Sequence, residues 1–102
     1  GSAAMVTDRA AWSEATARWL REAVDAGLPT LGICYGHQLL AHALGGEVGH
    51  HPDGREMGTV DIELHDAAHA DPLFAGLPAR FPAQATHLQT VLRAPAGATV
   101  LA

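Results

Sequence analysis

The chain has 102 residues, 48% of them apolar and 17% charged, a balance typical of one globular domain. The formal net charge is −5 and the six basic residues are scattered arginines, so we expect no nucleic-acid partner. No apolar run approaches the ~20 residues that span a bilayer, and the N-terminus does not resemble a signal peptide. We therefore expect neither a membrane partner nor secretion.

The single cysteine, Cys34, excludes an internal disulfide and a zinc site of four cysteines. A lone thiol without disulfides is typical of a reducing compartment. The sequence therefore predicts a cytoplasmic protein. We also expect it to hold no metal and no cofactor.

The first predicted helix starts at Thr7-Asp8, where Thr7 suits an N-cap, and ends at Gly27. The apolar residues of one face recur at helical spacing: Trp12, Ala15, Trp19, Leu20 and Ala23. A pair of tryptophans can form a ligand platform, but on an amphipathic helix we expect both to pack in the core.

An apolar run over residues 29–34 lacks alternation and predicts a strand buried on both faces. Helical spacing returns over residues 39–44 and stops at Gly45-Gly46. The order helix, strand, helix predicts an α/β fold.

The second half of the chain differs in pattern and predicts strands in antiparallel or edge positions of a sheet. Residues 59–64 alternate between apolar and polar, as in a half-solvated strand. Asp71-Pro72 predicts a turn into a short helix, and weaker strands are expected over 80–85 and 99–102, separated by a loop at 94–97. Because the last strand reaches the final residue, we expect the natural domain to continue.

The segment Gly32-Ile33-Cys34-Tyr35-Gly36 has the Gly-x-nucleophile-x-Gly form of a nucleophile elbow. Such a strand-to-helix turn strains the nucleophile's backbone, and the glycines allow close approach of the chain. The helix that follows directs free N–H groups at the site, which favours a thiolate and stabilises an oxyanion. An inert buried cysteine is the alternative, and the pattern favours the nucleophile.

These residues, with His37-Gln38 after them, resemble the nucleophile region of class I glutamine amidotransferases, most closely the glutaminase domain of GMP synthases and its stand-alone relatives. The resemblance continues, in the family's order, through Gly54-Arg55-Glu56-Met57-Gly58, Asp71-Pro72-Leu73-Phe74 and Thr86-His87-Leu88-Gln89-Thr90-Val91. It implies a three-layer α/β open sheet of the flavodoxin-like or Rossmann-like kind, here truncated at both ends.

The resemblance also implies roles for single residues. Cys34 matches the nucleophile that attacks the side-chain amide of glutamine, and Tyr35 matches the position whose backbone N–H faces the oxyanion. Gly1 or Ser2, in a segment similar to the family's Gly-rich loop, would supply the second backbone donor. Gln38 matches a position that helps hold the α-amino and carboxylate groups of the substrate, and Leu88 and Gln89 match a loop that contacts the substrate mainly through backbone atoms. His37 is interpreted as structural support and His87 as a shaping residue.

The chain departs from the family in one respect. The family's catalytic His and Glu belong to a His-Pro-Glu motif near the C-terminus of the domain, and this sequence contains none. His51-Pro52-Asp53 is similar but lies too close to Cys34 along the chain to be that pair. We expect residues 1–102 to be one partial domain, inactive by itself.

Three functions remain open. The leading one is a glutaminase module that hydrolyses glutamine and supplies ammonia to a synthetase domain or subunit. The second is hydrolysis of another γ-glutamyl amide or peptide, which shares the thioester and differs in the leaving group. The third is a non-catalytic subunit that binds a partner, which the missing His-Pro-Glu favours and the intact elbow disfavours.

Overall fold

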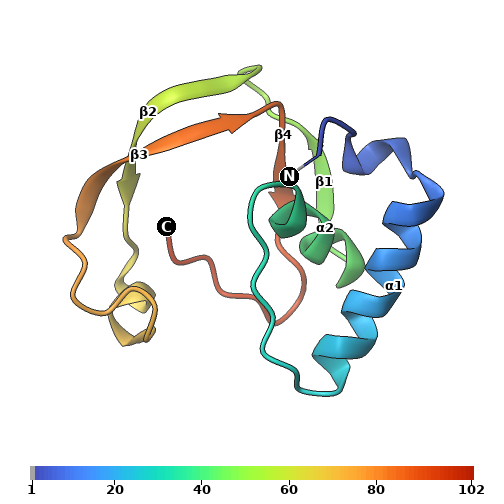
Figure 1. Cartoon of the computed structure of the whole chain (residues 1–102). Helices are drawn as coiled ribbons and strands as arrows, with labels where there is room; N and C mark the ends of the chain where they lie inside the picture. Colours follow the sequence, from blue (N-terminus) through green and yellow to red (C-terminus); the bar gives the residue numbers. More distant parts are fainter. Residues whose placement is uncertain (1) are drawn as a thin grey trace.

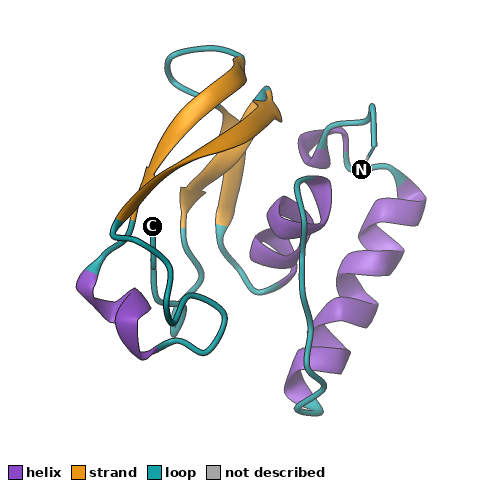
Figure 2. Cartoon of the chain, turned by 60° about the vertical axis from the view of Figure 1, so that its left-hand side comes forward, coloured by secondary structure: helices purple, strands orange, loops and turns teal. Residues whose placement is uncertain are grey.

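The computed structural model describes residues 2–102 and combines helices and strands, which confirms the α/β class. The elements in chain order are η1 (Val6–Asp8), α1 (Ala11–Asp25), α2 (Tyr35–Ala43), β1 (Glu47–His50), β2 (Glu56–Glu63), η2 (Asp66–Ala70), β3 (Arg80–His87) and β4 (Gln89–Arg93). The helices α1 and α2 gather with η1 beside the strands, and η2 lies at the far end of β2 (Figures 1 and 2). Within residues 2–102 no helix is long and apolar enough to cross a membrane.

The first helix begins later than expected, at Ala11 instead of Thr7-Asp8. The Asp8 carboxylate accepts the N–H of Met5 at 2.9 Å and closes a short 3₁₀ turn over Val6–Asp8. Arg9 then adopts a positive φ of 53°, which a right-handed helix cannot contain. The predicted end is confirmed, because the helix stops at Asp25 and Gly27 has φ 74°.

The prediction that both tryptophans are core residues is wrong. Trp12 and Trp19 are 53% and 61% exposed, while the buried positions of α1 are Ser13, Ala17 and Ala23. Small side chains on this face allow α1 to approach α2 closely. Trp12 lies at the edge of that contact, stacked on Tyr35 with ring centroids 5.6 Å apart.

Residues 29–34 form a loop, so the strand predicted there is also wrong. Leu31 and Ile33 are 75% and 73% exposed, and no described strand pairs with this segment. A strand exists only where a neighbour completes its hydrogen bonds, and apolar composition does not provide that neighbour. The helix that follows, α2, and its end before Gly45 (φ 88°) agree with the prediction.

The strands form two antiparallel pairs, β1 with β4 and β2 with β3. Alternation along β2 is confirmed, because every second residue of Glu56–Glu63 is exposed. The strand expected over 80–85 is confirmed as part of β3, and the loop over 94–97 is also present. The turn at Asp71-Pro72 is present without the expected helix after it, and residues 99–102 are not a strand, although Leu101 O accepts the N–H of His65 at 2.8 Å.

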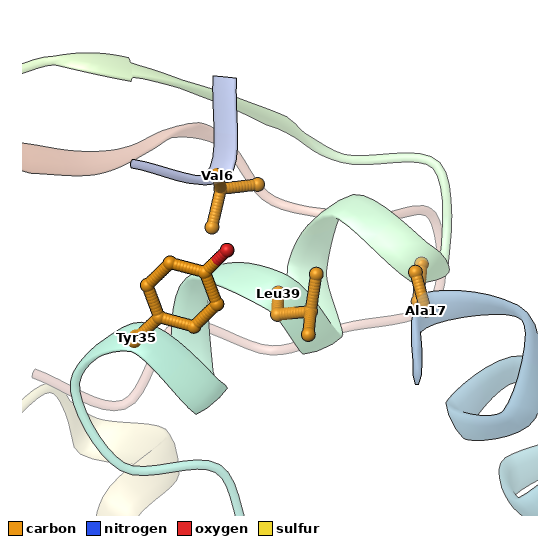
Figure 3. Packing of buried hydrophobic residues seen from close by; sticks show 5 residues of the cluster. Val6, Ala17, Tyr35 and Leu39 are labelled. Atoms are coloured by element: carbon orange, nitrogen blue, oxygen red, sulfur yellow. The ribbon is translucent and has the colours of Figure 1, made fainter. Parts of the chain in front are cut away.

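The core is small and lies where η1, α1 and α2 meet. Figure 3 shows Val6, Ala17, Tyr35 and Leu39 converging from these three elements. Helix α2 also contacts β1 and β4, so it connects the helices to the first sheet. Strands β2 and β3 contact chiefly each other and extend from this core as a two-stranded ribbon (Figure 1).

Candidate active site

Cys34 has a strained backbone. It is exposed, immediately precedes the first residue of α2, and has φ 53° and ψ −112°. A non-glycine residue rarely adopts this conformation, and strain of this kind costs of order 1–3 kcal/mol. The chain therefore has the sharp turn into a helix that the elbow pattern predicts.

The two glycines of the elbow differ in what they allow. A Cβ at Gly32 would lie 2.7 Å from the carbonyl oxygen of Gly36 and 2.8 Å from the Cα of His37, so only glycine fits. A Cβ at Gly36 would meet nothing within 4 Å. Close approach thus explains Gly32 and does not explain Gly36.

An open cavity of about 380 Å³ lies beside Cys34. It brings together six of the seven residues for which the resemblance implies a catalytic or substrate-binding role: Ser2, Cys34, Tyr35, Gln38, Leu88 and Gln89. The seventh, Gly1, lies outside the described residues. The Cys34 thiol is 4.0 Å from the carbonyl oxygen of Thr86, which joins the elbow to the end of β3.

A hydrogen-bonded network positions residues 86–89, which line the cavity together with Cys34. Gln38 donates from Nε2 to the carbonyl oxygen of Gln89 at 2.7 Å, and His87 Nδ1 contacts the same oxygen at 2.9 Å. His87 Nε2 lies 2.6 Å from the Glu56 carboxylate. His87 therefore lies between two acceptors, a backbone carbonyl oxygen and a carboxylate. This arrangement fits a shaping role for His87.

Two polar groups of the site differ in their surroundings. Gln89 is 1% exposed and donates from Nε2 to Thr7 Oγ1 at 2.6 Å, while its Oε1 is buried with no hydrogen-bond partner among residues 2–102.

The Tyr35 backbone N–H is at the free N-terminal end of α2. Its phenol is buried and shares a 2.7 Å hydrogen bond with Ser13 Oγ, which fixes α2 against α1.

The other histidines lie outside the cavity. His37 is exposed on α2 and is not among the described residues that line the cavity beside Cys34. His51 accepts the backbone N–H of Asp53 on Nδ1 at 3.2 Å and lies edge-on to His87, 5.9 Å between ring centroids. The His51-Pro52-Asp53 segment therefore forms a turn and does not orient a histidine with the Asp53 carboxylate. Across residues 2–102 no three His, Cys, Asp or Glu side chains gather as a metal site would require.

Two residues of this region had no role in the sequence interpretation, Arg55 and Glu56. Arg55 lines the cavity, and Glu56 holds His87 from the first position of β2. The signal for both was present, because they lie within the Gly-Arg-Glu-Met-Gly segment of the resemblance. Their roles depend on pairing between β2 and β3, in which Glu56 is directly opposite His87.

Comparisons with known proteins agree with this geometry. Residues 6–102 match the family described as glutamine amidotransferase class-I. Proteins named GMP synthase [glutamine-hydrolyzing] are similar: that of Aeropyrum pernix is 51% identical over 79 residues, or 78% of this chain, and that of Clostridium novyi 37% over 91 residues, or 89% of this chain. The chain spans only 15% and 17% of the length of these two relatives.

Solved structures of glutamine amidotransferases are also similar to this chain. A glutamine amidotransferase from Thermotoga maritima superposes with a TM-score of 0.85 at 25% identity, covering 99% of this chain and 43% of that one. A glutamine amidotransferase from Methylobacillus flagellatus gives 0.77 at 32% identity, covering 88% of this chain and 35% of that one. The chain belongs to the class-I glutamine amidotransferase family.

Proposed function

We propose that this chain carries the nucleophile and part of the substrate pocket of a glutaminase. The observation that supports this most is the strained Cys34 at the start of α2, facing a cavity that Gln38 and the Leu88-Gln89 segment also line. A thiol in this position meets the free N–H groups of a helix N-terminus, which stabilise negative charge. Family membership gives this geometry its chemical context.

In the proposed reaction the Cys34 thiolate attacks the side-chain carbonyl carbon of glutamine. The tetrahedral oxyanion accepts the Tyr35 N–H and a second backbone N–H from Gly1 or Ser2. The C–N bond breaks, the nitrogen takes a proton, and ammonia leaves. Water then cleaves the γ-glutamyl thioester, releasing glutamate and restoring the thiol.

The proton transfers need a general base and acid. The sequence contains no His-Pro-Glu, and His51 and His37 are not among the residues that line the cavity. His87 is held between two acceptors, which suits a positioning role. We therefore propose that residues 1–102 are one partial domain and that the native polypeptide supplies the base from outside them.

Substrate binding is assigned to Gln38, one helical turn after Cys34 on α2, and to the Leu88-Gln89 segment, which lines the same cavity. Gln38 contributes its side chain, and Leu88 and Gln89 contribute backbone groups held by the Gln38–Gln89 hydrogen bond. The relatives named GMP synthase [glutamine-hydrolyzing] support glutamine as the substrate. They also support a synthetase domain or subunit as the acceptor of ammonia. The lone cysteine supports a cytoplasmic location.

The test is Cys34→Ala in the native polypeptide that carries this segment. We expect glutamine turnover to fall at least ~10³-fold, because removal of a nucleophile leaves only the residual catalysis of the pocket. Intact-mass spectrometry of the unmodified enzyme during turnover should reveal a γ-glutamyl adduct on Cys34 that the variant lacks. Turnover retained by Cys34→Ala, with its fold intact by circular dichroism, would refute the assignment. Brisk cleavage of γ-glutamyl dipeptides with negligible glutamine turnover would show that the substrate is a γ-glutamyl peptide and not glutamine.

A further inference from the structure

Arg55 occupies a position in the cavity that the proposed chemistry does not yet use. It lies in the loop between β1 and β2, is exposed, and lines the same cavity as Cys34 and Gln38. Three other arginines (Arg9, Arg80 and Arg93) each form an ion pair. Within residues 2–102 Arg55 forms none, so its guanidinium has no carboxylate partner in the described part of the chain.

The described residues that line the cavity carry positive charge and no negative charge. Of the described residues that line it, Arg55 carries a positive charge and none is Asp or Glu. The nearest acid in sequence, Glu56, directs its carboxylate to His87 at 2.6 Å and does not line the cavity. The cavity therefore attracts an anionic group and has an arginine available to bind one.

We infer that Arg55 binds the α-carboxylate of the substrate whose side-chain amide reacts at Cys34, and so selects γ-glutamyl amides with a free carboxylate over uncharged ones; this rests on the proposed glutaminase function. A guanidinium matches a carboxylate with two parallel N–H···O bonds, which gives orientation as well as affinity. The carboxylate and the reacting amide are at opposite ends of glutamine. The cavity of about 380 Å³ is within the range of small-molecule sites and is lined by Cys34 and Arg55 together.

The experiment compares two electrophiles that differ only in this charge. 6-Diazo-5-oxo-L-norleucine has the shape of glutamine, and its attack by a thiol forms a thioether and releases N₂ after protonation of the diazo carbon. Its α-methyl ester has no carboxylate. Both are reacted with the native polypeptide carrying Arg55, Arg55→Gln, Arg55→Lys or Arg21→Gln, and labelling of Cys34 is followed by intact mass. Arg21, exposed on α1 and not among the residues that line the cavity, is the matched control.

We expect the unmodified enzyme and Arg21→Gln to label faster with the acid than with the ester. Arg55→Gln should slow labelling by the acid about 10- to 100-fold, the range for losing a hydrogen bond between charged groups, and leave the ester rate unchanged. Arg55→Lys should label with the acid at an intermediate rate, because lysine keeps the positive charge but cannot form two parallel hydrogen bonds with a carboxylate.

Two results would overturn the inference alone: equal slowing of both reagents by Arg55→Gln, which indicates a structural role, or no slowing of either. If iodoacetamide labels Cys34 in the unmodified enzyme and neither glutamine-shaped reagent does, the proposed function fails and this inference fails with it.

Discussion

Cys34 and Gly32 together explain how this short segment holds a thiol in a strained turn. The backbone of Cys34 has φ 53°, and the chain before it passes so close to α2 that a Cβ at Gly32 would lie 2.7 Å from Gly36 O. The obstructing atoms belong to the backbone of α2, which cannot yield as a flexible side chain would. The strain at Cys34 is therefore maintained by packing at Gly32.

Gly32→Ala should lower the free energy of unfolding by about 1–3 kcal/mol, the usual cost of overpacking. Gly36→Ala is the control: its Cβ meets nothing within 4 Å, and alanine in place of glycine inside a helix gains about 0.8–1 kcal/mol. Urea denaturation of the unmodified protein and the two variants measures both changes in the free energy of unfolding. Equal effects of the two substitutions would contradict close approach as the reason for Gly32.

The ribbon of β2 and β3 carries the segment that lines the cavity opposite the elbow. Its register places Glu56 opposite His87, and their 2.6 Å contact lies at the end of the ribbon nearest Cys34. His87 in turn contacts the carbonyl oxygen of Gln89, the residue that begins β4. One side-chain pair thus connects two strands to the turn that leads into a third.

A double-mutant cycle with Glu56→Gln and His87→Gln should give a coupling free energy of about 0.5–1 kcal/mol, since the two side chains are 38% and 24% exposed and solvent weakens the pair. The control cycle uses Asp61 and Arg80 on the same ribbon, 3.6 Å apart and more than 60% exposed, with an expected coupling below ~0.3 kcal/mol. Chemical denaturation measures both cycles. If the exposed pair couples as strongly as the half-buried one, burial is not what strengthens the Glu56–His87 contact.

The whole molecule depends on a small core. The radius of gyration of 14.2 Å is slightly above the ~13 Å typical of a chain of 100 residues, because the β2–β3 ribbon extends away from the helices (Figure 1). The buried cluster of Val6, Ala17, Tyr35, Leu39 and Ala43 contains only three large side chains. A single large truncation within it should therefore have a large effect.

Leu39→Ala, at a position 3% exposed, should reduce the free energy of unfolding by about 2–5 kcal/mol. The matched control is Leu73→Ala, because Leu73 is 75% exposed and should change stability by less than ~0.5 kcal/mol. Thermal and urea denaturation measure both. A small effect at Leu39 would show that the cluster does not control stability.

Local features were predictable because they depend on neighbours within a few residues. Helix α2 with its end at Gly45, the alternation of β2 and the strained turn at Cys34 follow from side-chain spacing, glycine and the elbow pattern. The first helix was misplaced at its start because Arg9 takes a positive φ, which sequence propensity does not reveal.

The sequence by itself determined the family, the elbow and the elements whose hydrogen bonds close locally. Only the tertiary structure decided which distant segments meet: Thr86 beside Cys34, Gln89 bonded to Gln38, and Arg55 at the edge of the same cavity. It also left residues 29–34 without a strand partner and the two tryptophans exposed. The physical reason is that strand pairing and burial depend on surfaces brought from elsewhere in the chain, and one-dimensional periodicity does not specify those surfaces.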